Sequence, residues 1–123
     1  MPCFINSKAL RLPNLEEIHI YNNVIDSLEI TSSIATTIGN IVFLQLDTGK
    51  AIQDTSFMKN LFNLKDEFKF LAPKKYLPIF TLNGASDISL IIQLDKSGAF
   101  KAFGPSRNYN RISLYGTAIY ITY

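Results

Sequence analysis

YLPIFTLNGASDISLIIQLDKSGAFKAF, residues 76–103, is the stretch of sequence that decides the fold. Within it, Ile88, Leu90, Ile92 and Leu94 fall on every second position, and polar residues fill most of the positions between them. A period of two places the apolar side chains on one face of an extended strand and the polar side chains on the other. The sequence therefore predicts a half-buried strand over residues 88–94, with these four residues in the core.

A turn follows this strand at Asp95-Lys96-Ser97-Gly98. Gly98 can adopt the positive φ that closes a tight turn, because it carries no side chain. Ala99 to Phe103 then reads as the return strand, so residues 88–103 are predicted to form a β-hairpin.

Two further strand signals lie in the first half of the chain. Ile18 and Ile20 alternate with polar residues up to Asn22-Asn23, a pair that suits a tight hairpin turn into a second strand from Val24 to Thr31. Residues 41–46 read IVFLQL and are apolar on both faces, which predicts a strand that needs cover on both sides. Its second face could be covered by a neighbouring subunit or by loops of the same domain.

The second half of the chain contains several shorter signals. Residues 56–64 predict one helical turn or an irregular packed connection, whereas alternation over 68–72 predicts a short strand that ends at Pro73. Near the C-terminus, Ile119 and Ile121 fall on the opposite parity from Ile112 and Leu114. A glycine between such segments, here Gly116, predicts a β-bulge, with Ile119 and Ile121 on the apolar face.

These segments amount to about eight or nine short strands at close spacing, with no long helical pattern. We therefore predict a single all-β domain over residues 1–123, an antiparallel β-sandwich of jelly-roll-like form. Residues 1–14, which include Pro2 and Pro13, are predicted to form an N-terminal arm or an irregular lead-in.

Composition excludes several classes of function. Charged residues make up 18% of the chain and the formal net charge is +2, so neither extensive disorder nor a nucleic-acid partner is expected. No apolar run approaches the length of a membrane span, and the first residues lack the features of a signal peptide. Cys3 is the single cysteine, so the fold has no intrachain disulfide.

The residues that usually carry catalysis are sparse. His19 is the only histidine and lies on the predicted polar face of a strand, and no Cys-His spacing resembles a zinc site. In the acidic pair Asp66-Glu67, adjacent strand residues would point to opposite faces. We therefore predict a protein that is not an enzyme, with no catalytic residue, no cofactor and no metal. A small glycan-active hydrolase is the alternative, and it would need two carboxylates within about 5–10 Å of each other.

The clearest loop, Gly104–Arg111, carries the candidate ligand-binding residues. Guanidinium and amide groups can bind sugar hydroxyls, a tyrosine ring offers a flat apolar face, and loops on a rigid scaffold commonly carry binding groups. The predicted site consists of Arg107, Asn108, Tyr109, Asn110 and Arg111. In the competing interpretation, Tyr109 packs against the end of the sandwich and the two arginines only solvate the loop.

The order of these segments resembles the C-terminal head modules of bacteriophage tail-fibre and baseplate proteins, especially those of phages that infect Gram-positive bacteria. The likeness covers residues 39–123, and residues 1–38 carry none of it. It rests on Asn40–Leu46, Phe70-Leu71-Ala72-Pro73, Tyr76-Leu77-Pro78, Ile88–Leu94, Asp95–Gly98 with Ala99-Phe100, and Ile119–Tyr123.

This resemblance implies a small β-sandwich that assembles as a homo-oligomer, with a trimer favoured, and that contacts other tail proteins. It also implies a structural or receptor-binding role in the virion, with a host cell-surface saccharide as ligand, after synthesis in the bacterial cytoplasm. No binding residue carries over from the family. A further alternative is an intracellular β-sandwich interaction module of a bacterium. Genes for tail proteins next to the gene for this chain would argue against that alternative.

Overall fold

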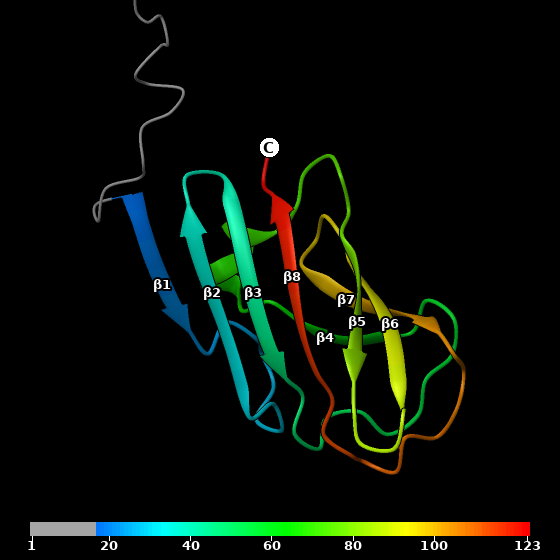
Figure 1. Ribbon diagram of the computed structural model, residues 1–123. Coiled ribbons are helices and arrows are strands. Elements are labelled where there is room, and N and C mark those ends of the chain that lie inside the picture. Colours follow the sequence, from blue (N-terminus) through cyan, green and yellow to red (C-terminus); the bar gives the residue numbers. More distant parts are fainter. Residues whose placement is uncertain (1–16) are drawn as a thin grey trace, which may run out of the picture.

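The described chain folds into antiparallel strands and the short 3-10 helix η3 (Figure 1). The computed structural model describes residues 17–123, so the arm predicted for residues 1–14 lies outside the described residues. The elements are β1 (Ile18–Asn22), β2 (Ser32–Ile38), β3 (Ile41–Asp47), β4 (Asn60–Asn63), η3 (Asp66–Leu71), β5 (Ile79–Asn83), β6 (Ser89–Leu94), β7 (Ala99–Gly104) and β8 (Tyr115–Ile121).

The strands form one curled sheet in the order β1-β2-β3-β8-β5-β6-β7-β4, and each described pairing is antiparallel. The all-β antiparallel prediction is thus confirmed. The strands are not divided into the two separate sheets of a sandwich, because β5 and β8 remain joined. That junction is narrow, since Asn83 and Tyr115 are the one pair of residues that links the two strands.

The two ends of the sheet meet through the connection between β1 and β2. Ile25 in that connection forms an isolated bridge with Leu64, directly after β4. On either side of the bridge, the Asp26 amide donates to the Asn63 carbonyl at 2.8 Å and the Lys65 amide donates to the Val24 carbonyl at 2.9 Å. These hydrogen bonds fix the curl, so both halves of the sheet enclose a shared interior.

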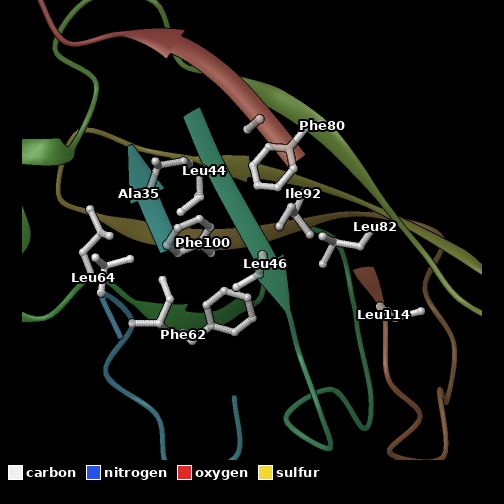
Figure 2. Packing of buried hydrophobic residues seen from close by; sticks show 14 of the residues in the cluster. Ala35, Leu44, Leu46, Phe62, Leu64, Phe80, Leu82, Ile92, Phe100 and Leu114 are labelled. Atoms are coloured by element: carbon white, nitrogen blue, oxygen red, sulfur yellow. The ribbon is translucent and has the colours of Figure 1, made fainter. Parts of the chain in front are cut away.

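The interior holds one apolar cluster drawn from both halves of the sheet (Figure 2). Leu44 comes from β3, whereas Phe62 and Phe100 come from β4 and β7, and the two phenylalanine ring centroids lie 4.9 Å apart. In the predicted core row, Leu90, Ile92 and Leu94 are fully buried and Ile88 packs against the cluster. The face assignment of this strand is therefore confirmed.

The predicted hairpin is present, and Asp95 organises its turn. One oxygen of the Asp95 carboxylate accepts hydrogen bonds from the Ser97 amide, the Ser97 hydroxyl and the Ala99 amide, and Gly98 has a φ of 87°. Burial raises the pKa of Asp95, but hydrogen bonds from Ser97, Ala99 and Lys101 outweigh it and hold that pKa below its ordinary value.

The first hairpin is longer than predicted. Asn23 does adopt the left-handed conformation, with a φ of 55°, but no tight turn forms there. Strand β1 instead pairs with Ser32–Ile38, so the prediction of a strand from Val24 to Thr31 was wrong. The physical reason lies in burial: Val24 and Ile25 insert into the core, which bends the chain away from the sheet before β2 begins.

Two predictions in the middle of the chain were also wrong. Residues 60–63 form strand β4, where one helical turn or an irregular connection was expected. Residues 66–71 form η3, where a strand was expected over 68–72. In a 3-10 helix, positions three apart share a face, and Phe68 and Leu71 both pack on the core while Phe70 is exposed. The apolar residues of this segment are therefore buried at a spacing of three, as in a 3-10 helix, and not at the spacing of two that the sequence pattern predicted.

The bulge predicted at Gly116 is absent. The register between β3 and β8 runs without a shift from Asp47↔Tyr115 to Ile41↔Ile121. The inward row continues from Gly116 to Ala118 and Tyr120, so Ile119 and Ile121 lie on the outer face and are exposed. The glycine has a packing role instead, because a Cβ there would lie 2.7 Å from the Thr81 carbonyl oxygen and 2.5 Å from a Leu82 methyl group.

Replacing Gly116 by alanine is therefore expected to destabilise the domain by about 1–3 kcal/mol, since the new methyl group forces β5 away from β8. The matched control is Thr117→Ala on the adjacent outward position, which should stay within about 0.5 kcal/mol. Urea denaturation followed by circular dichroism measures both. If the two variants had equal denaturation midpoints, β5 could move away from β8 without any loss of stability. The packing role of Gly116 would then be wrong.

Candidate functional site

Tyr109, the central residue of the predicted loop site, lies inside the domain. Its side chain is 1% exposed, and its hydroxyl donates a hydrogen bond to the Ser89 carbonyl at 2.9 Å. Burial raises the pKa of this phenol, and the positive charge of nearby Arg107 partly offsets that effect. The ring therefore packs inside the domain, as in the competing interpretation of the sequence, and its role toward a ligand stays a prediction.

The other four predicted residues are exposed, but the structure does not gather them around a cavity. Arg107 lies over the Tyr109 ring, 5.2 Å from its centroid, and Arg111 pairs with Glu29 at 3.2 Å. The Asn108 side chain accepts a hydrogen bond from the Asn110 amide at 2.7 Å, which shapes the loop locally. Whether this loop binds a saccharide stays a prediction.

The loop itself is held firmly on the domain. Thr55 donates from its hydroxyl to the Pro105 carbonyl at 2.8 Å, and its amide donates to the Arg107 carbonyl at 3.0 Å. The Gly104–Pro105 peptide bond is cis. Residues 104–111 thus form an ordered connection between β7 and β8.

A hollow of about 410 Å³ on the outer face of the sheet is a better candidate site. It lies where β5 leaves β8, beyond the one pair Asn83↔Tyr115 that joins them. Gly116, on the inward row of β8, lines the hollow with backbone atoms only. The lining residues come from β2, β3, β5 and β8: Ser32, Gln45, Leu46, Asp47, Thr81, Asn83, Tyr115, Gly116 and Thr117.

The polar groups of this hollow are available to a ligand. Within the described part of the chain, no hydrogen bond involves the side chains of Gln45, Thr81, Asn83, Tyr115 or Thr117. The Tyr115 ring is 55% exposed at the edge of the hollow. An exposed aromatic ring among unpaired amides and hydroxyls matches the alternating apolar and hydroxyl-bearing surface of a sugar.

The hollow is poorly suited to hydrolysis. Asp47 is the only carboxylate among its described lining residues, and one of its oxygens already accepts a hydrogen bond from the Gly49 amide at 3.0 Å. Glycosidases commonly need a second carboxylate across the scissile bond. The arrangement therefore offers binding groups without the acid-base pair.

Other residues singled out in the sequence bring no further chemistry together. His19 is exposed on β1 and stacks on Tyr21 with ring centroids 6.3 Å apart, whereas Cys3 lies outside the described residues. Over residues 17–123, no group of three or more metal-ligating side chains is clustered. The same residues contain no helix long and apolar enough to cross a bilayer.

The signal for this hollow is weak in the sequence because its residues are far apart. Gln45, Thr81 and Thr117 are each unremarkable polar positions on separate strands. The strand order brings them together on one face, and that order is not evident from local patterns. No protein-family model and no curated protein sequence matches this chain.

Proposed function

We propose that this chain is a non-enzymatic component of a bacteriophage or prophage tail or baseplate that binds a host cell-surface saccharide. The tail assignment rests on the resemblance of residues 39–123 to tail-fibre and baseplate head modules. The resemblance also motivates a homo-oligomer, with a trimer favoured, in contact with other proteins of the virion.

The observation that carries the binding part is the exposed Tyr115 ring beside unpaired polar side chains in the outer-face hollow. Asn83 and Gln45 can each donate and accept hydrogen bonds, as neighbouring sugar hydroxyls require. Tyr115 can cover an apolar face of a sugar ring. Because strands β3, β5 and β8 carry these residues, the site is rigid and loses little conformational entropy when a ligand binds.

Replacing Tyr115 by alanine is expected to weaken saccharide binding by about tenfold or more, since the stacking surface is lost. The probes are purified cell-wall polysaccharides from Gram-positive bacteria, with binding measured by titration calorimetry. Tyr76→Ala is the matched control, because Tyr76 is comparably exposed but does not line the hollow.

Two results would contradict this assignment. If Arg107→Ala weakened binding while Tyr115→Ala did not, the site would lie on loop 104–111. If the unmodified protein bound none of the polysaccharides, a purely structural tail role would replace the adhesion role. A melting curve for each variant separates loss of binding from loss of fold.

A further inference from the structure

The outer face of β1, β2, β3 and β8 breaks the usual pattern of a solvated antiparallel sheet. Such a sheet normally has an apolar face on the core and a polar face in water. Here the inward row of β3 is Val42, Leu44 and Leu46, yet the outward row also includes Ile41 and Phe43. The exposed face of this strand therefore needs an explanation other than the protein's own core.

Strand register continues this apolar character across four strands. One row of paired residues runs from Ile18 through Ile38 and Ile41 to Ile121, and the next runs from Ile20 through Thr36 and Phe43 to Ile119. We call these two rows, without Thr36, the outer apolar patch. Ile20 is 64% exposed and Ile119 is 66% exposed, so the patch is open at both of its lateral edges.

The described chain leaves this patch uncovered. In Figure 1 the strands β1, β2, β3 and β8 lie side by side in front, while β4 and η3 lie behind them. The next rows along the same strands are mostly polar and lead into the hollow at Gln45 and Thr117. The outer face is thus divided into an apolar half and a polar, ligand-sized half.

The area of the patch is comparable with that of a protein interface. Its most exposed members, Ile20, Ile41, Phe43, Ile119 and Ile121, leave roughly 500 Å² accessible, near the upper end for the largest patch on a monomer. Two copies packed through this patch would bury roughly 1,000 Å² in total, about the minimum for a specific protein interface.

The chemistry of the patch favours a copy of itself as partner. It contains no charged residue, so it offers no complementarity to an anionic membrane or a charged peptide. Flat, β-branched sheet faces pack on one another about 10 Å apart, as in the interior of a sandwich. An interface that uses the same patch twice closes about a two-fold axis.

We propose that a second copy of this chain covers the outer apolar patch, face to face, in a two-fold dimer. This inference rests on the exposed isoleucines and does not depend on saccharide binding. It differs from the trimer that the resemblance implies, because a three-fold ring needs two different contact surfaces on each copy.

Sedimentation equilibrium of the full chain at micromolar concentration tests the proposal. The expected mass is twice the chain mass of 13.8 kDa. Ile119→Glu is expected to raise the dimer dissociation constant by about a hundredfold or more, because each interface then buries two unpaired carboxylates. Ile20→Lys tests the opposite edge of the patch with the other charge.

Leu28→Glu is the matched control, since Leu28 is fully exposed and lies outside the patch. A monomeric unmodified chain would overturn the proposal, and so would an oligomer that Ile119→Glu and Ile20→Lys leave intact. An oligomer of three that Ile119→Glu dissociates would keep the patch as an interface but overturn the two-fold arrangement. A monomer that dimerises only after deletion of residues 1–16 would identify that segment as the occupant instead.

Discussion

Replacing Tyr109 by alanine is expected to lower the free energy of unfolding by about 3–5 kcal/mol, the cost of removing a large buried aromatic side chain. The ring is buried in the apolar cluster, and its hydroxyl is bonded to the Ser89 carbonyl near the start of β6. Removal leaves a cavity and breaks the hydrogen bond to the Ser89 carbonyl. Urea denaturation followed by circular dichroism measures the change.

Tyr109→Phe distinguishes the contribution of the ring to stability from that of the hydroxyl. It keeps the packing and removes one hydrogen bond, so it should cost only about 0.5–1.5 kcal/mol. Arg107→Ala removes the exposed guanidinium above the ring and should cost about 1 kcal/mol or less. An alanine variant as stable as the phenylalanine variant would mean that the ring lies outside the core, where it could still serve a ligand.

Replacing Leu90 by alanine is expected to cost about 2–5 kcal/mol. Leu90 is fully buried near the start of β6, where Leu82 is its paired residue on β5. Denaturant midpoints and slopes give the change in stability.

Gln93→Ala is the control on the opposite face of the same strand. Its side chain is half-buried and does not belong to the core cluster, so the change should stay within about 0.5 kcal/mol. Similar losses at Leu90 and Gln93 would contradict the assignment of inner and outer faces. The comparison is sharp because both residues belong to one strand with one register.

Period-two patterns predicted the fold well where the inner row was also the more apolar row. That condition holds for Leu90, Ile92 and Leu94. It fails in β8, where the inner row is Gly116, Ala118 and Tyr120, with small or hydroxyl-bearing side chains. The outer row of β8 is richer in isoleucine, so the sequence pattern pointed to the wrong face and suggested a bulge that does not exist.

The candidate site was harder to predict for a different reason. Arg107, Asn108 and Tyr109 are adjacent in sequence and form a loop, so they stood out as a group. Adjacency, however, does not determine burial, and the Tyr109 ring turned inward. The residues around the hollow belong to four strands and become neighbours only through the order β2-β3-β8-β5.

The central place of β8 has a consequence for how the protein is made. Residues 115–121 are the last strand along the chain, yet they fill the gap between β3 and β5. During synthesis, the β1-β2-β3 and β5-β6-β7-β4 groups emerge first, each with an unpaired edge that another nascent chain could occupy. Completion of the sheet therefore depends on pairing between strands far apart in the sequence, such as β3 with β8, which makes folding slow and sensitive to protein concentration.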